Sequence, residues 1–169
     1  MDKAMDQSNE GKGEPGAAAD IVIRPPTLFL GGLAAGSIVE LFWPLGPGLA
    51  QGSWKPVVIG LFFAACGIAF SFRSVTALTN AGTDFKFEDG SSAVVKSGLY
   101  KLSRNPIYIG LVIAYFGLAL ALTSGWALII LPLCIAALNR GVIAREEEFL
   151  EAKFGDDYRA YRAKVPRWL

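Results

Sequence analysis

The chain has 169 residues, of which 53% are apolar and only 18% are charged, and its net charge is +1. A soluble domain usually carries about 25% charged residues, and so weak a net charge offers no strong field for nucleic acid. Histidine is absent, and the two cysteines, Cys66 and Cys134, each lie inside an apolar run. These features exclude histidine-based catalysis and leave no cysteine- or histidine-rich metal site, so no metal is expected.

The first 24 residues are polar, rich in glycine and alanine, and nearly free of aromatic side chains. No apolar stretch closely follows the first basic residue, as a secretory signal would require. We therefore predict a disordered tail over residues 1–24 and a single membrane domain over residues 25–169.

Two apolar runs follow, at residues 27–45 and 54–72. Each is near the ~20 residues that a helix needs to cross the hydrocarbon of a bilayer. The first run carries Glu40 near its end, and we expect this carboxylate at the interface or paired with a buried partner. The same run contains small residues that would let another helix approach closely: Gly31, Gly32, Ala35 and Gly36.

A longer apolar region covers residues 107–138. As one helix it would reach about 48 Å, which is too long for a bilayer core of ~30 Å. Division at "TSGW", residues 123–126, predicts a tight hairpin with short spans at 106–122 and 125–139. Basic residues gather in the tail, between the second and third spans, and after the hairpin. Four spans with both termini in the cytoplasm place all three groups on one side.

Residues 140–165 are predicted to form cytosolic helices after the hairpin. Gly155 is expected to end one helix, and the aspartates that follow it to begin the next. An apolar stripe with helical spacing runs through this region and needs a partner or a membrane surface: Leu150, Phe154, Tyr158, Tyr161 and Val165. The predicted fold is thus all-α, an integral membrane helical bundle with about four spans and cytosolic C-terminal helices.

The stretch "SRNP" precedes the third span. Asn105 and Pro106 are favoured at the N-cap and first position of a helix, and Arg104 could simply extend to the membrane interface. The same geometry also suits ligand binding. A helix N-terminus offers unpaired N–H groups, and the arginine fork matches a carboxylate.

Three consecutive glutamates begin at Glu146, directly after the hairpin, where basic residues are the norm. They could form a solvated helix face, or Glu146 or Glu147 could bind an ammonium group or ribose hydroxyls. Tyr100 and Tyr108 leave a similar choice between an interfacial aromatic belt and stacking or cation–π contact with a ligand.

In their order and spacing, these segments resemble the isoprenylcysteine carboxyl methyltransferase and phospholipid methyltransferase families of integral membrane enzymes. The resemblance covers residues 81–168, about half of the chain. It rests on "AGT" at 81–83, "SGLYKLSRNPIYIG" at 97–110, "REEEFLEAKFG" at 145–155 and "YRAYRAKVPRWL" at 158–169. Asn105 stands where the carboxyl methyltransferases commonly have histidine, which leaves the acceptor open.

The resemblance implies S-adenosylmethionine as the methyl donor, with S-adenosylhomocysteine as its product. It implies a cytosolic pocket roofed by the C-terminal helices, and a lipophilic or prenylated acceptor that enters from the membrane lipid. Arg104 would position the acceptor or the carboxylate of the cofactor. Cofactor contacts would fall at Val94, Val95, Tyr100, Asn105, Pro106, Tyr108 and Glu146.

Methyl transfer from a sulfonium needs positioning and desolvation more than proton transfer. A carboxylate acceptor is already ionised at pH 7 and needs no base, which favours isoprenylcysteine-type carboxyl O-methylation. Methylation of a phospholipid ethanolamine, the alternative, would require a base, for which Glu147 is the candidate. An NADPH-dependent membrane reductase and a non-catalytic, partner-binding membrane protein are the remaining alternatives.

Overall fold

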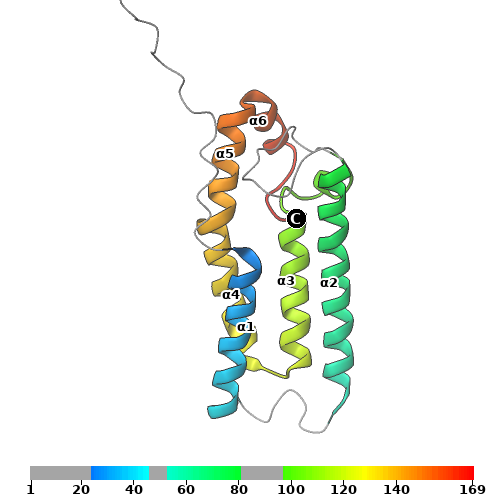
Figure 1. Cartoon of the computed structure of the whole chain (residues 1–169), viewed down its shortest axis with the longest axis vertical. Helices are drawn as coiled ribbons and strands as arrows, with labels where there is room; N and C mark the ends of the chain where they lie inside the picture. The colour runs from blue at the N-terminus through cyan, green and yellow to red at the C-terminus, as the bar shows by residue number, and fades with distance from the viewer. Residues whose placement is uncertain (1–23, 46–52, 81–96) are drawn as a thin grey trace, which may run out of the picture.

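A computed structural model describes residues 24–45, 53–80 and 97–169, and in these ranges the chain is helical and contains no strand. The all-α bundle predicted from the sequence is confirmed (Figure 1). Apart from Arg24, the predicted N-terminal tail lies outside the described residues. The elements are α1 (Pro25–Phe42), α2 (Lys55–Asn80), the 3-10 turn η2 (Gly98–Lys101), α3 (Pro106–Ala121), α4 (Gly125–Leu138), the π-turn η3 (Asn139–Ile143), α5 (Ala144–Phe154) and α6 (Asp156–Arg162).

Among the described residues, three helices are long and apolar enough to cross a membrane: α1, α2 and the continuous helix Gly125–Phe154 that joins α4, η3 and α5. The shorter apolar helix α3 has 16 residues. At ~1.5 Å per residue α3 reaches only about 24 Å, whereas the joined helix reaches about 45 Å and extends well past a bilayer core of ~30 Å. The chain therefore has one short and one overlong arm side by side, and the polar residues gather where the long arm extends past the short one.

The turn between α3 and α4 lies at the predicted "TSGW" segment. Thr123 has a positive φ of 51°, and the Ser124 hydroxyl accepts a hydrogen bond from the Ala127 amide at 3.1 Å. At the same end of the bundle, the carboxylate of Glu40 accepts from the Leu45 and Trp126 amides, at 2.8 and 3.1 Å. Glu40 thus ties the end of α1 to the start of α4 through backbone amides.

Two helix ends differ from the apolar runs read from the sequence. α2 continues to Asn80, eight residues beyond residue 72, and the hydroxyls of Ser74, Thr76 and Thr79 donate to carbonyls four residues earlier. Such bonds let polar residues remain in a helix. α1 ends at Phe42 rather than residue 45. Pro44 disfavours the helical conformation for the residue before it.

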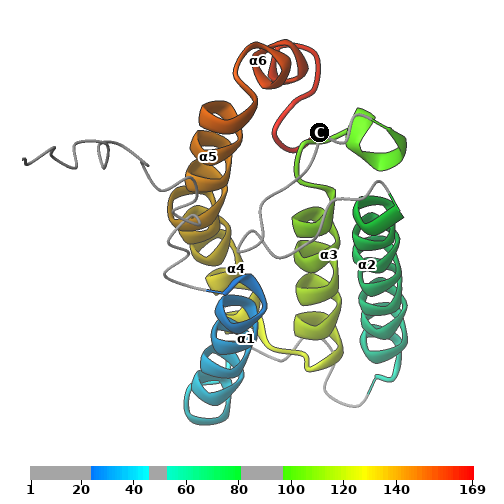
Figure 2. The ribbon, with the colours of Figure 1, turned by 45° about the horizontal axis from the view of Figure 1, so that its top comes forward.

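The helices lie in pairs, α2 with α3 and α1 with α4 (Figure 2), and small residues allow the close approach within each pair. A Cβ atom on Gly67 would lie 2.4 Å from the backbone nitrogen of Ala114 in α3, and one on Gly36 would lie 2.5 Å from that of Ala127 in α4. Since lipid is as apolar as these helices, close packing of this kind stabilises their association. Gly31, by contrast, has open space around it.

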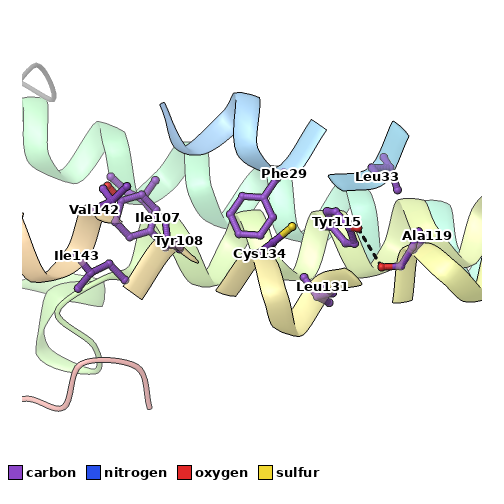
Figure 3. Close-up of a cluster of buried hydrophobic side chains, with 12 residues drawn as sticks. Phe29, Leu33, Ile107, Tyr108, Tyr115, Ala119, Leu131, Cys134, Val142 and Ile143 are labelled. Atoms are coloured by element: carbon purple, nitrogen blue, oxygen red, sulfur yellow. Dashed lines mark hydrogen bonds between the residues drawn. The ribbon is translucent and has the colours of Figure 1, made fainter. Parts of the chain in front are cut away.

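The apolar core runs along the centre of the bundle toward the N-terminal end of α3, the head of α3, which begins at Asn105 and Pro106 (Figure 3). Tyr115 lies in it beside Phe29, and its hydroxyl donates to the Ala127 carbonyl at 2.9 Å. Cys134 is buried in the same cluster, whereas Cys66 is exposed, and both thiols are free. The cluster ends with Tyr108 and the π-turn, where the polar residues begin.

Candidate active site at the head of α3

The head of α3 begins as the sequence predicts, with Asn105 at the N-cap and Pro106 as the first helical residue. The Asn105 side chain makes no capping bond. Its amide nitrogen donates instead to the Arg167 carbonyl at 3.0 Å, and its backbone N–H donates to the Ser103 hydroxyl at 3.0 Å. The first turn is closed by the Asn105 carbonyl, which accepts from the Tyr108 amide at 3.1 Å.

Residues 163–169, the C-terminal strap, run from α6 back to the head of α3 (Figure 1). The Arg104 amide donates to the Pro166 carbonyl at 2.9 Å, and the Ser103 hydroxyl donates to the Arg167 carbonyl at 3.1 Å. The indole N–H of Trp168 donates to the Asn139 side chain in the π-turn at 3.1 Å. The strap therefore connects the short arm of the bundle to the long one.

The glutamate triplet divides between the inside and the surface. Glu146 and Glu147 are 5% and 6% exposed, while Glu148 is exposed. They follow the π-turn Asn139–Ile143, which adds a residue to one helical turn and so rotates the helix after it. Hence α5 does not simply present all three carboxylates to solvent.

Glu147 binds two arginines. Arg167 holds both carboxylate oxygens, with Nε 3.0 Å from Oε1 and Nη2 2.5 Å from Oε2, and this bond raises the pKa of Arg167. Nη1 of Arg104 forms an ion pair with Oε1 at 2.8 Å. The two predicted catalytic residues, Arg104 and Glu147, are thus brought into contact, with a third residue that the sequence reasoning did not name.

Arg104 retains unused hydrogen-bonding capacity. Its Nε and Nη1 atoms are buried and form no hydrogen bond, although the charge of Nη1 is paired with Glu147. A hydrogen bond from Arg104 also reaches Tyr158, whose pKa is raised by burial, an effect that this bond opposes. A buried guanidinium with free donors is a site that an anionic ligand can complete.

Glu146 pairs with Tyr108, whose hydroxyl donates to Oε1 at 2.5 Å, and both side chains are buried. Tyr100 lies in η2, and burial, followed by the neighbouring Tyr161 and Glu146, raises its pKa. The Tyr161 hydroxyl donates to the Tyr100 carbonyl at 2.7 Å; burial raises the pKa of Tyr161 to about 12, so it remains a donor at neutral pH. A carboxylate and several phenols therefore line one buried region.

The predicted apolar stripe of the C-terminal region packs on itself. Gly155 has a φ of +51° and turns the chain between α5 and α6. Tyr158, Tyr161 and Val165 are buried as one cluster, with Leu150 and Phe154 packed against them. The stripe thus packs as a small cluster beside the N-terminal end of α3.

Most of the residues predicted to form the site come together at this end of the bundle. The exceptions are Val94 and Val95, which lie outside the described residues. The sequence reasoning missed Arg167, Trp168 and Asn139. "VPRWL" belongs to the segments that carried the family resemblance, but no spacing rule pairs Arg167 with a glutamate 20 residues earlier. No group of three potential metal ligands occurs in the part of the chain that the structure describes. The roles of the site residues stay predictions.

The fold and the site define a helical membrane protein with a buried polar cluster at one end of its spans. Residues 56–157 match the phospholipid methyltransferase family, and the chain belongs to that family. This confirms the resemblance drawn from its motifs. The protein is therefore a membrane methyltransferase by class.

Two relatives match parts of the chain. An uncharacterized protein of Haemophilus influenzae is 41% identical over 63 residues, which are 37% of this chain and the whole of that protein. A protein-S-isoprenylcysteine O-methyltransferase of Schizosaccharomyces pombe is 30% identical over 96 residues, which are 54% of this chain. The chain spans 41% of the length of the yeast enzyme. No solved structure matches.

Proposed function

We propose that the protein transfers a methyl group from S-adenosylmethionine to a lipophilic acceptor at the cytosolic membrane face, by isoprenylcysteine-type carboxyl O-methylation. The observation that carries the proposal is the buried polar cluster at the head of α3, where Glu146 bonds to Tyr108 and Arg104 retains free donors. Family membership supports methyl transfer, and the yeast relative's name suggests the carboxylate acceptor.

The residues at this site fit the charges of such a cofactor. S-adenosylmethionine supplies an electrophilic methyl group on a cationic sulfur and also carries an ammonium, a carboxylate and ribose hydroxyls. Glu146 offers a buried carboxylate to a cation or to hydroxyls, and the Nε and Nη1 donors of Arg104, which form no hydrogen bond, suit a carboxylate. Tyr108 fixes the orientation of the Glu146 carboxylate through their hydrogen bond.

The transfer itself forms one bond and breaks one. A lone pair on the acceptor oxygen bonds to the methyl carbon, and the electrons of the carbon–sulfur bond return to sulfur, so no proton moves. The protein then has to position and desolvate the reactants. Burial of the cluster between α3, α5 and the C-terminal strap supplies water exclusion.

The contacts of Glu147 favour an acceptor that needs no base. Both of its oxygens are held by Arg167, and Arg104 lies beside one of them. In this proposal Glu147 holds the arginines and does not accept a proton. N-methylation of a phospholipid ethanolamine is the second candidate, and the name of the matched family favours it.

Calorimetry in detergent tests the cofactor. We expect S-adenosylhomocysteine to bind in the micromolar range and NADPH not to bind. Glu146→Ala and Tyr108→Ala should each weaken binding at least about tenfold, roughly 1.4 kcal/mol. Glu148→Ala, which removes the exposed carboxylate of the same triplet, is the matched control and should leave the affinity unchanged. Absence of binding to the unaltered protein, or tight binding of NADPH, would refute the proposal.

A methyl-transfer assay then separates the acceptors. Purified protein is given a methyl-labelled cofactor with either a farnesylcysteine analogue or phosphatidylethanolamine in mixed micelles. Base-labile methyl ester on the farnesylcysteine analogue is the expected product. Labelled N-methylated phospholipid in its place would establish the second candidate.

The basic-residue distribution further supports a multi-pass topology with both termini in the cytoplasm. Leu169 is 85% exposed, so Leu169→Cys in a Cys66→Ser background gives a reporter at the C-terminus. A membrane-impermeant thiol reagent should label it only in permeabilised cells. Labelling of intact cells would reverse the proposed orientation.

A further inference from the structure

Two arginines, Arg104 and Arg167, contact the single carboxylate of Glu147. Arg167 uses its guanidinium fork, Nε and Nη2, to hold both oxygens of Glu147. Paired bonds of this kind are the strongest that arginine makes with a carboxylate. Arg104 pairs its charge with Glu147 at 2.8 Å through Nη1, but neither Nη1 nor Nε forms a hydrogen bond.

Arg104 is held in place from its backbone. Its amide donates to the Pro166 carbonyl, and the next residue in the strap is Arg167 itself. The Arg104 side chain is only 11% exposed, so water does not reach the Nε and Nη1 donors, which form no hydrogen bond, in place of a ligand. Leaving buried, charged donors unpaired is costly, and a bound anion would remove that cost.

We infer that Arg167 is a positioning residue: by holding both oxygens of Glu147, it keeps the donors of Arg104 available for an anionic group of the bound ligand. This rests on the proposed methyltransferase function and adds a residue that the family resemblance did not assign. The anionic group is a carboxylate, and both the cofactor and a carboxyl acceptor carry one.

Loss of Arg167 has a defined consequence in this arrangement. The oxygens of Glu147 lose their fork partner, and the nearest alternative cation is Arg104, already 2.8 Å away. Glu147 then takes the donors of Arg104 that the ligand requires. Removal of the Glu147 charge as well should release Arg104 again. A purely structural role for Arg167 predicts the opposite, because each lost bond would weaken the site further.

The test compares Arg167→Gln with the double variant Arg167→Gln/Glu147→Gln. Arg162→Gln is the matched control, because Arg162 also pairs with a glutamate of α5, Glu151, at 3.0 Å, but in a more exposed position. Dissociation constants are measured for S-adenosylhomocysteine and for 5′-methylthioadenosine, which lacks the amino-acid carboxylate. Melting temperatures without ligand report the stability of each variant.

Arg167→Gln should weaken S-adenosylhomocysteine binding about tenfold, and the double variant should recover to within about threefold of the unaltered protein. Arg162→Gln should stay within about twofold, and 5′-methylthioadenosine binding should not respond to any of the changes. Should Arg167→Gln prove too unstable, Arg167→Lys keeps the charge without the fork and is expected to show a loss of about threefold.

The outcomes separate the possible ligands and the possible failures. If cofactor binding is unaffected but the KM of the acceptor rises in Arg167→Gln and recovers in the double variant, the acceptor supplies the carboxylate and the inference holds. If the double variant binds both reactants no better than Arg167→Gln, or if 5′-methylthioadenosine is affected equally, the inference is wrong while the proposed function stands. If the unaltered protein does not bind S-adenosylhomocysteine, both fail.

Discussion

Two clusters of the same composition lie one helical turn apart on α5, each with one glutamate and two arginines. In the inner cluster, Glu147 is 8% exposed at its side chain and binds Arg104 and Arg167. In the outer one, Glu151 is 33% exposed and binds Arg159 and Arg162, whose side chains are 61% and 49% exposed. All contacts to the two glutamates are within 3.0 Å, but only the inner cluster has a two-bond fork, and its shortest contact is 2.5 Å against 2.9 Å in the outer one.

Solvation is what separates the clusters. Water competes for the outer charges and screens them, so exposed pairs of this kind add little stability. At the inner cluster little water reaches Glu147 and Arg104, so each charge depends on its partners. The inner cluster also joins three chain segments, α5, the head of α3 and the C-terminal strap, whereas the outer one joins only α5 to α6. A count of ion pairs would rate the two equally and would miss this difference.

Removal of each central glutamate should give the largest contrast. Glu147→Ala leaves two arginines without their carboxylate, one of them buried, and should destabilise the protein by about 3 kcal/mol. Glu151→Ala should leave the melting temperature unchanged within error. Thermal unfolding in one detergent at neutral pH measures both. Equal shifts for the two variants would show that burial does not separate the clusters.

Trp168→Phe should have a smaller effect, because it removes one tie of the strap while keeping an aromatic ring. The indole N–H donates to Asn139 at 3.1 Å, and loss of one such bond costs about 1 kcal/mol. Arg159→Ala, which removes two exposed contacts of α6, is the control and should have no measurable effect. A melting temperature for Trp168→Phe equal to that of the unaltered protein would contradict a holding role for the strap.

A change in salt concentration should produce the smallest difference between the two clusters, and it tests directly whether water and ions reach each of them. Raising ionic strength from 0.1 to 1 M shortens the screening length from about 10 to about 3 Å. Any thermal coupling between Arg162 and Glu151 in a double-mutant cycle should disappear, whereas coupling between Arg167 and Glu147 should persist. Loss of both couplings in high salt would mean that water and ions reach the inner cluster freely.

Several features of this molecule were readable from local chemistry. Ser124 caps α4, Gly155 separates α5 from α6, and Asn105-Pro106 begins α3, each as its residue type favours. The apolar helices follow from the length and apolarity of the runs. These signals are local because they depend on the conformations and bonds of a few neighbouring residues.

Other features had no local signal. The extension of α2 to Asn80 rests on hydroxyls that bond within the helix, beyond the end of the apolar run at residue 72. The Asn105 amide, expected as a cap, turns to a carbonyl 62 residues away. No simple pattern announces the π-turn after α4, yet it sets which glutamates of the triplet are buried.

The sequence by itself determined that this is a helical membrane protein with a short hairpin, and its motifs indicated the methyltransferase family. Apolar length, glycine and proline placement and motif order are properties of the chain read along its length. Only the tertiary structure decided which charges meet. Glu146 accepts a hydrogen bond from Tyr108, and Glu147 binds Arg167 of the C-terminal strap. Both contacts form because a π-turn rotates α5 and the strap folds back across the bundle. Those pairings depend on distances between remote segments, which periodicity along a sequence does not encode.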